Sequence, residues 1–208
     1  MVALPFRINN QMILGLNERS HSAVAAIDAS GAVLRYGELL SFSERIGSLL
    51  SARSLLFLLT ENNVGGIAWS MGCINSGNVP LILNAHIEEE LYHNLFEIYR
   101  PSYVCLPTRM ASALRYEIVC ECYGYTLLHT GMGPCTLHAD LSHLLPTSGS
   151  TGSPKLVRHK YGNIEAAALN ISTSLGLRLM TGHCWCCLCI IRWDCQSYSV
   201  ICMWALLY

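Results

Sequence analysis

The chain has 208 residues, enough for one domain of good size, and 52% of them are hydrophobic, which is ample material for a core. The formal net charge is −1, and no basic run or stripe gives the electrostatic pattern of a nucleic-acid-binding protein. The opening stretch, MVALPFRINNQMILGLNERS, lacks a basic start followed by a continuous apolar segment. We therefore expect no secretory signal, no integral membrane segment and a cytoplasmic location.

The first part of the chain predicts a strand, a helix, a second strand and a second helix. The short strand is Val33–Arg35, and the helix after it is amphipathic. Its apolar positions at helical spacing are Leu39, Leu40, Ile46, Leu49 and Leu50. Ser54–Leu59 is a continuous apolar run, typical of a strand that is covered on both faces. The stretch VGGIAWSMGCINSG predicts a helix that ends at Gly77, because glycine readily adopts the left-handed conformation found after a helix.

The middle of the chain continues this alternation. Val79–Leu83 predicts a strand, and IEEELYHNLFEIYR predicts a helix with acidic residues in its first turn, where they favour the helix dipole; Pro101 ends it. SYVCL is the next buried strand, residues 108–118 are expected to be helical, and Tyr125–Leu128 is an expected strand. Leu141–Leu145 leads into a polar loop, and NIEAAALNISTSLGL predicts a helix after it. Alternating strands and helices with short connections predict an α/β fold with a largely parallel sheet.

The polar loop PTSGSTGSPK lies between a predicted strand and a predicted helix, a setting in which proteins hold phosphate groups. Gly149 and Gly152 have no Cβ, so the backbone can turn tightly and present its N–H groups to an anion. Further donors are the ammonium group of Lys155 and the hydroxyls of Thr147, Ser148, Ser150 and Thr151. A Walker A loop is excluded, because Ser153 and Pro154 separate the second glycine from the lysine. Such loops are also common as plain connectors, but the lysine and the strand–loop–helix context favour a phosphate site.

The stretch TSGSTGSPKLV, followed by His159 and Asn163, resembles the signature loop of the adenylate-forming (AMP-forming) acyl-CoA synthetase and ligase superfamily, whose pattern is roughly T-S-G-[ST]-T-G-x-P-K-x-V. LRYGELLSFSERIGSLL and ENNVGGIAWSMGCINSGNVPLILNAHIEEELYHNLFEIYRPSYV are also similar to family stretches. The resemblance covers about Tyr36 to Leu177. It implies that the α/β fold is the N-terminal part of the large domain of an AMP-forming ligase, truncated.

The resemblance also implies two-step chemistry. ATP and a carboxylic acid give an acyl-adenylate and pyrophosphate, and the acyl group then passes to the thiol of coenzyme A or of a carrier. Adenylation turns a carboxylate oxygen into a good leaving group, and N–H groups, hydroxyls and a lysine, with Mg²⁺, stabilise the charge that develops on pyrophosphate. The residues expected to bind pyrophosphate are Thr147, Ser148, Gly149, Ser150, Thr151, Gly152 and Lys155.

Other polar residues give weaker indications. His159, Lys160 and Asn163 are expected either near the nucleotide or in the polar first turn of a solvated helix. Five further histidines show no metal-ligand spacing and are interpreted as surface or hydrogen-bonded core residues: His86, His93, His129, His138 and His143. The C-x-C pair Cys120 and Cys122 lacks partner ligands. No metal site and no catalytic residue are assigned to this chain.

The end of the chain departs from the family pattern, with six of the eleven cysteines and three of the four tryptophans between residues 184 and 204. HCWCCLC lacks the paired C-x₂-C spacing of zinc sites, and Arg192 and Asp194 interrupt any membrane-spanning run. A frame shift near codon 178 accounts for this composition, because CTG leucine codons displaced by one base encode only cysteine, tryptophan or stop. We expect a partial AMP-binding domain at residues 1–178 and an aberrant tail at residues 179–208.

By resemblance, the adenine-binding and ribose-binding segments and the catalytic lysine of the family are missing from this chain. The leading expectation is therefore an ATP-dependent carboxylic acid:CoA ligase present as an inactive fragment, whose partners are ATP and a small carboxylic acid and not a nucleic acid. The alternative expectation is a non-catalytic module that binds a nucleotide or phosphate. A stand-alone cysteine-rich metal protein is the third and weakest expectation.

Overall fold

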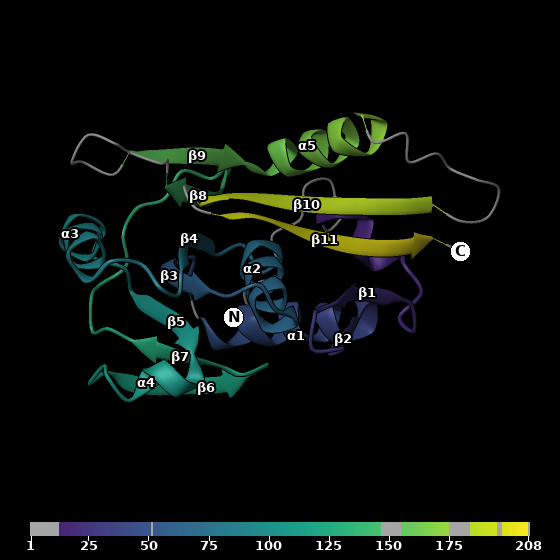
Figure 1. Ribbon diagram of the computed structural model, residues 1–208. Coiled ribbons are helices and arrows are strands. Elements are labelled where there is room, and N and C mark those ends of the chain that lie inside the picture. The colour runs from purple at the N-terminus through teal and green to yellow at the C-terminus, as the bar shows by residue number, and fades with distance from the viewer. Residues whose placement is uncertain (1–12, 51, 147–154, 175–183, 195–196, 208) are drawn as a thin grey trace.

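A computed structural model describes residues 13–50, 52–146, 155–174, 184–194 and 197–207 of the chain (Figure 1). Helices and strands alternate through most of this part. In chain order the elements are the 3₁₀ helix η1 (Ile13–Glu18), β1 (Val24–Ile27), β2 (Val33–Arg35), α1 (Tyr36–Leu49), β3 (Leu55–Thr60), α2 (Val64–Asn75), β4 (Val79–Asn84), α3 (Glu89–Tyr99), β5 (Tyr103–Pro107), α4 (Thr108–Ala111), β6 (Glu117–Cys122), β7 (Tyr125–His129), β8 (Leu141–Pro146), β9 (Leu156–Lys160), α5 (Tyr161–Ser174), β10 (Cys184–Asp194) and β11 (Ser197–Leu207).

A seven-stranded sheet in the order β6-β7-β5-β3-β4-β8-β9 forms the centre of the fold. The four central strands β5, β3, β4 and β8 are parallel, and antiparallel strands flank them at both edges. The expected α/β class with a largely parallel sheet is therefore confirmed, with its parallel part in the middle. The expected strands at β3, β4, β5, β7 and β8 are all members of this one sheet.

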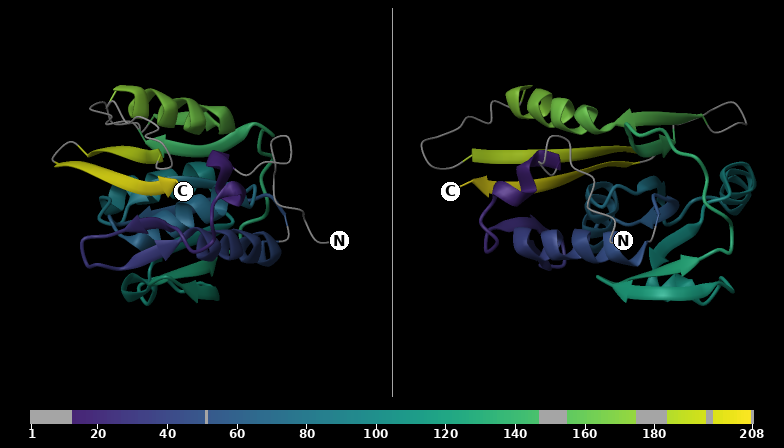
Figure 2. Two further views of the ribbon diagram at one scale, coloured as in Figure 1. Left: turned by 90° about the vertical axis from the view of Figure 1, so that its right-hand side faces the viewer. Right: turned by 180° about the vertical axis from the view of Figure 1, so that it is seen from behind.

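Two hydrophobic clusters cover the two faces of the sheet. Along β3 the side chains alternate between them, so Leu56 and Leu58 join one cluster and the other cluster takes Leu55, Phe57 and Leu59. Helices α1 and α2 pack in the first cluster, and α3 packs in the second. Figures 1 and 2 show this arrangement, with α3 on the side of the sheet away from α1 and α2. The continuous apolar run in β3 is explained by this cover on both faces.

Helix α2 has clear start and stop signals. Asn63 caps its first turn, because the side-chain Oδ1 accepts the backbone N–H of Gly66 at 2.8 Å. At the other end Gly77 has a φ of 83°, as its expected left-handed role requires. The N–H of Gly77 donates to the carbonyl of Ile74 at 3.1 Å, and the N–H of Asn78 donates to that of Cys73 at 2.9 Å. This pair of bonds is the Schellman motif, which turns the chain sharply into β4.

Arg53 precedes β3 and connects several elements at the amino end of the sheet through hydrogen bonds. Its guanidinium donates to the carbonyl of Gly77 at 2.6 Å, to the hydroxyl of Tyr161 at 3.0 Å, to the carbonyl of His138 at 3.0 Å and to the carbonyl of Leu141. These partners belong to the end of α2, the start of β8 and the start of α5. One side chain therefore sets where β8 and the hairpin that follows it meet the rest of the fold.

The chain differs from expectation between residues 108 and 122. A helix over residues 108–118 is wrong in most of its length, because α4 has only four residues and β6 begins at Glu117. Strand β6 lies at the sheet edge and exposes much of both faces, so it lacks the apolar pattern that marks the central strands. Strand β6 forms a hairpin with β7.

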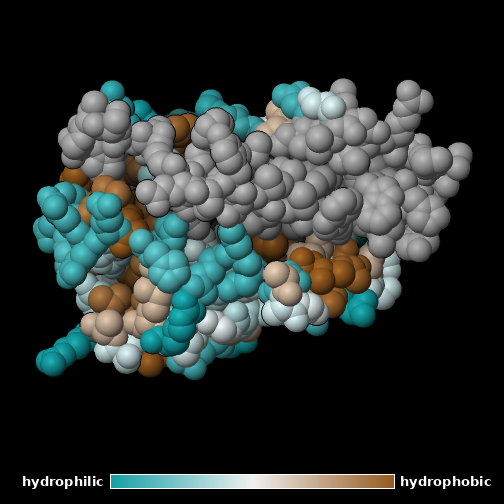
Figure 3. All heavy atoms as spheres, in the orientation of Figure 1, coloured by the Kyte–Doolittle hydropathy of each residue, from teal (hydrophilic) through white to brown (hydrophobic). Residues whose placement is uncertain are grey.

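Two smaller pairs of strands lie outside the main sheet. Strands β1 and β2 pair antiparallel, and the exposed side chains of Ile27 and Val33 are cross-strand partners there. A small hydrophobic area at the right of Figure 3 lies over this pair. Strands β10 and β11 form a separate antiparallel pair. The proposed boundary at residue 178 lies outside the described residues, among which no helix is long and apolar enough to cross a membrane.

Candidate active site at the carboxyl edge of the sheet

The carboxyl ends of the parallel strands meet at one edge of the sheet, where α/β proteins commonly bind their ligands. Strand β4 pairs with β8 through Leu81 and Leu144, so the residues that follow the two strands emerge next to each other. The polar loop follows β8 directly, after Pro146. Glu61 follows β3, His86 follows β4, and Arg109 follows β5. This edge therefore gathers charged residues beside the start of the loop.

The loop connects two strands and does not lead directly into a helix. Pro146 in β8 is the cross-strand partner of Leu156 in β9, and α5 begins only at Tyr161. The expected strand–loop–helix context is therefore wrong, because five residues after the loop pair with β8 before the helix starts. An anion here would meet the donors of a hairpin loop and not the N-terminus of a helix.

The expected pyrophosphate residues fall in two groups. Lys155 is described and exposed, immediately before β9. The next residue, Leu156, is the cross-strand partner of Pro146, so Lys155 lies beside the end of β8. The residues that lie outside the described part of the chain are Thr147, Ser148, Gly149, Ser150, Thr151 and Gly152.

His159 and Lys160 lie in β9, so the expectation that they form the first turn of a helix is wrong. Lys160 pairs with Asp140 at 3.5 Å, and His159 is the cross-strand partner of His143. The Ser142 hydroxyl lies 2.9 Å from Nδ1 of His143 and donates to the carbonyl of His159 at 2.9 Å. These contacts fix the register of the hairpin that carries the loop.

Asn163 is exposed in the first turn of α5, as the solvated-helix interpretation expects. The histidines interpreted as surface or core residues behave as expected too. His93 and His138 are exposed, and His93 pairs with Glu89 at 3.6 Å. His129 is partly buried with its ring against Tyr103, and the buried His143 has the hydrogen bond already given. No group of three or more His, Cys, Asp or Glu side chains in the described residues is arranged to hold a metal ion.

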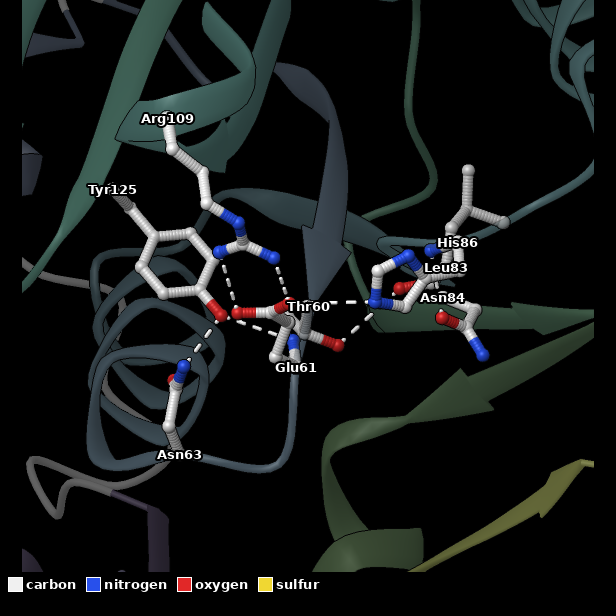
Figure 4. A network of polar contacts seen from close by, with 8 residues as sticks. All are labelled: Thr60, Glu61, Asn63, Leu83, Asn84, His86, Arg109 and Tyr125. Atoms are coloured by element: carbon white, nitrogen blue, oxygen red, sulfur yellow. Dashed lines mark hydrogen bonds and ion pairs between the residues drawn. The ribbon is translucent and has the colours of Figure 1, made fainter. Parts of the chain in front are cut away.

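Glu61 and Arg109 form the main ion pair of the edge (Figure 4). The two guanidinium nitrogens of Arg109 donate to the two carboxylate oxygens of Glu61, one of them at 2.9 Å. This bidentate geometry is the strongest form of such a pair. The hydrogen bond from Arg109 is the main reason that the pKa of Glu61 is lowered. Glu61 is therefore ionised at neutral pH.

Tyr125 supports this pair from the first residue of β7. Its hydroxyl accepts the backbone N–H of Glu61 at 3.0 Å and donates to Oδ1 of Asn63 at 3.1 Å. Burial raises the pKa of Tyr125, so the hydroxyl keeps the proton that it donates. Asn63 also caps α2, so one chain of hydrogen bonds joins the start of α2, the end of β3 and the start of β7 (Figure 4).

His86 is the most exposed member of the network. Its Nε2 lies 3.5 Å from Oε1 of Glu61, and its backbone N–H donates to Oδ1 of Asn84 at 2.8 Å. Its side chain is 72% exposed, compared with 24% for Glu61. The ring thus stands at the surface while its carboxylate partner lies below it.

Glu61, Arg109, Tyr125 and Asn63 were not predicted as site residues. The signal that would have found Glu61 and Arg109 is their position, because Glu61 directly follows the apolar strand β3 and Arg109 comes two residues after the end of β5. Tyr125 carries no such signal. It reaches Glu61 only because β7 turns back antiparallel on β5, with Tyr125 opposite Pro107.

Comparisons with known proteins agree on the fold. No family model matches the chain, and no curated protein matches it. Among solved structures, o-succinylbenzoate coenzyme A synthetase from Bacillus subtilis in complex with AMP is similar with a TM-score of 0.60 and 18% identity, over 80% of this chain and 46% of the synthetase. The same synthetase in complex with ATP and a magnesium ion matches with a TM-score of 0.60 and 17% identity, over 80% of this chain and 47% of that one.

Two other kinds of enzyme match over a similar stretch. MatB from Rhodopseudomonas palustris has a TM-score of 0.55 and 18% identity over 78% of this chain and 37% of its own. A nonribosomal peptide synthetase has a TM-score of 0.59 and 19% identity over 79% of this chain and 18% of its own. All of these neighbours are AMP-forming ligases.

The chain thus has the fold of the N-terminal part of an AMP-forming ligase domain, and the resemblance inferred from the loop is confirmed at the level of fold. It spans less than half the length of the synthetase that it matches.

Proposed function

We propose that this chain provides the pyrophosphate-binding part of an AMP-forming carboxylate ligase. Such an enzyme joins ATP and a carboxylic acid to give an acyl-adenylate and pyrophosphate, and then transfers the acyl group to a thiol, that of coenzyme A or of a carrier. The observation that carries the proposal is the position of the signature loop, between β8 and β9 and next to the carboxyl edge of a sheet with the ligase fold.

In this proposal the donors of residues 147–152 and the ammonium group of Lys155 hold the β and γ phosphates of ATP. As the carboxylate attacks the α phosphorus, negative charge moves onto pyrophosphate, and fixed donors stabilise that charge. The hairpin holds both ends of the loop, at Pro146 and Leu156.

Mg²⁺ and the acceptor thiol belong to the wider reaction. The neighbour that contains ATP also contains a magnesium ion, and such an ion would neutralise charge on the phosphates. We assign no step to the metal and propose a role only for the loop donors.

A pair of measurements tests the proposal on the full chain. Isothermal titration with pyrophosphate and with ATP is expected to show binding that Lys155→Ala weakens. ATP–pyrophosphate exchange that depends on an added carboxylic acid would support an enzyme. Binding without exchange is expected both of an inactive ligase fragment and of the alternative, a non-catalytic nucleotide-binding module. Absence of binding by either ligand would contradict both.

We also propose that residues 1–178 carry the ligase-like fold and that residues 179–208 read out of frame. This rests on the composition of the tail, because the displaced frame has a forced leucine codon at each of Cys184, Trp185, Cys187 and Cys195. Sequencing the DNA across codons 170–210 tests it. A missing base, or two added bases, near codon 178 is expected, whereas a continuous frame supported by related transcripts would contradict the proposal.

A further inference from the structure

The two cysteines of the C-x-C pair lie on one face of the edge strand β6. Cys120 is the cross-strand partner of Leu127 in β7. Cys122, two residues further on, is the partner of Tyr125. Both partners belong to the first hydrophobic cluster, and both cysteines pack against it. Glu121 lies on the opposite face, as the alternation of side chains along a strand requires. The two thiols are therefore neighbours on the same face of β6.

Both thiols can be reached from solvent. They are free and half-buried, and neither takes part in a hydrogen bond within the described residues. Strand β6 is the last strand of its sheet, and a pocket of about 370 Å³ between α1 and the β6–β7 turn is lined by Cys122. Figures 1 and 2 show β6 well away from β10 and β11, so the cysteines of those strands are not beside the pair. A small ion can therefore enter at this edge.

The spacing of the pair suits a metal ion held in line between two sulfur atoms. Two residues advance about 6.6 Å along a strand. A straight sulfur–metal–sulfur unit spans about 4.6 Å if each bond has the length of a zinc–thiolate bond, about 2.3 Å. Side chains on a strand lean along its direction, so a lean of about 1 Å by each sulfur closes the difference. The backbone of β6 need not move.

The number of available ligands excludes the commoner thiolate metals. Structural zinc and iron–sulfur clusters take four protein ligands, and no group of three or more ligands is present in the part of the chain that the structure describes. Cys73 and Cys105 belong to the same cluster but are fully buried. Burial raises the pKa of Cys73 to about 12 and that of Cys105 well above its usual value, so both keep their protons. The pair must bind a metal without them.

The charges near the pair suit a cation bound by thiolates. The carboxylate of Glu38 lines the pocket, and Glu121 lies between the two cysteines. Both attract a cation. Burial raises the pKa of Cys120, and the guanidinium of Arg45 opposes that rise. Arg45 thus favours the thiolate form, which a metal ion requires.

We infer that Cys120 and Cys122 form a two-coordinate site for a soft monovalent metal ion, Cu(I). Soft thiolate ligands select Cu(I), and this ion is stable with two sulfur ligands in line. On binding, each thiol releases its proton to solvent and each sulfur donates an electron pair to the metal, whose oxidation state does not change. The sequence shows no partner ligands for the pair, and Cu(I) needs none. No feature of the loop enters this inference, so it stands apart from the proposed ligase function.

The experiment uses the reduced full chain, kept free of air, with ¹³Cβ-labelled cysteine followed by NMR. Cu(I) is added as its bicinchoninate complex, which competes for the metal and reports by its colour how much has been removed. The resonances of Cys120 and Cys122, each identified by its loss in the serine variant, are expected to shift together and to saturate at one ion per pair. Cys135 is a lone exposed thiol, and its resonance is expected not to shift under the same conditions.

Substitutions test whether the two thiols act together. Cys122→Ser is expected to weaken the binding of Cu(I) at Cys120 by more than about a hundredfold, because loss of a ligand exceeds the 10–100-fold effect of losing an outer partner. Cys135→Ser is the matched control and is expected to leave that affinity unchanged. Zn²⁺, which lacks the further ligands that it needs, is expected not to shift the pair at equal free concentration.

Four results would overturn the inference. These are no shift of either resonance in the wild-type chain, a shift of Cys120 that Cys122→Ser leaves unchanged, binding of Zn²⁺ as tight as that of Cu(I), and shifts confined to the cysteines of residues 184–202. The last result would place the metal in the tail. Because the first and last results come from the wild-type chain, the test stands even if a serine variant fails to fold.

Discussion

The imidazole rings of His143 and His159 stack face to face across the β8–β9 hairpin, with 4.5 Å between their centroids and 6° between their planes. His143 is buried, and the hairpin that these rings join carries the candidate phosphate loop. A proton on His143 would place a charge in an apolar position and against a second imidazole. The stack therefore requires neutral rings. Protonation of His143 at acidic pH should destabilise the β8–β9 hairpin.

We predict that the free energy of unfolding falls between pH 6.5 and about 3. Burial, and to a smaller extent the charge of His159, lowers the pKa of His143 to about 3 in the folded chain. Above pH 6.5 the ring is neutral in both states. Below it the unfolded chain takes up a proton that the folded chain resists, so stability falls by up to about 1.4 kcal/mol per pH unit.

Urea titrations at several pH values check this prediction. His143→Phe should flatten the dependence, and His93→Gln, which changes an exposed histidine on α3, should leave it as it is. An equally steep dependence in His143→Phe would show that other groups cause the loss of stability.

Replacing Lys155 should affect ligand binding without affecting stability. Lys155 is exposed before β9, so Lys155→Ala is expected to leave Tm within about 1 °C, as for most surface changes. The loss of one charged hydrogen bond should weaken pyrophosphate binding about tenfold or more. Calorimetric titration measures the affinity. Lys160→Ala, five residues along the same segment and paired with Asp140, is the matched control and should bind pyrophosphate as the wild type does.

Removing the hydroxyl of Tyr125 should destabilise the carboxyl edge. In Tyr125→Phe the backbone N–H of Glu61 loses its acceptor and Asn63 loses one donor. Leaving a partly buried amide unpaired costs about 2 kcal/mol. Denaturant unfolding measures the loss, and faster hydrogen exchange at the Glu61 amide would locate it. Tyr103→Phe, which removes a hydroxyl without a hydrogen-bond partner in the described part of the chain, should cost much less.

A methyl group at Gly65 should be poorly tolerated, whereas one at Gly162 should be accepted. The Cβ of Gly65→Ala would lie 2.2 Å from the carbonyl oxygen of Tyr123, which is backbone and cannot swing away. We expect a loss of about 3 kcal/mol from this overpacking. In Gly162→Ala the Cβ meets nothing within 4 Å, and alanine in α5 should stabilise the chain by about 0.5 kcal/mol. Thermal unfolding of both variants would decide, and equal Tm values would contradict the packing argument.

The central elements were predictable because their sequence pattern has a local cause. β3, β4 and β5 are apolar because helices cover both faces. Helix α1 has the apolar periodicity of a helix, and Gly77 and Pro101 mark the ends of α2 and α3. The sequences of the edge strands β6 and β9 show no such pattern. β6 exposes much of both faces, and β9, with the sequence LVRHK, is short and charged. Each is a strand because its neighbour in the sheet offers it hydrogen bonds, which a local pattern does not reveal.

The candidate site also has one part that is local in the sequence and one part that only the fold brings together. The loop could be proposed from the sequence alone because its seven expected donor residues lie within one short stretch, as a backbone cradle for an anion requires, and its role stays a prediction. The pair of Glu61 and Arg109 was not, because 48 residues separate its members and only the sheet order brings them together. Tyr125 joins them from a third strand. Side chains that meet through strand register leave no spacing rule in the sequence.

The contacts of Arg53 have a consequence for the order in which the chain folds during synthesis. Its partners come 24, 85, 88 and 108 residues later in the sequence. Long-range contacts of this kind form late, since much of the chain must close before they can be made. A ribosome-bound chain that ends before Tyr161 has Arg53 with an incomplete set of acceptors, however well β3 and α2 have formed. The full set of hydrogen bonds from Arg53 therefore forms only after the β8–β9 hairpin and the start of α5 have been synthesised and have packed against the rest of the fold.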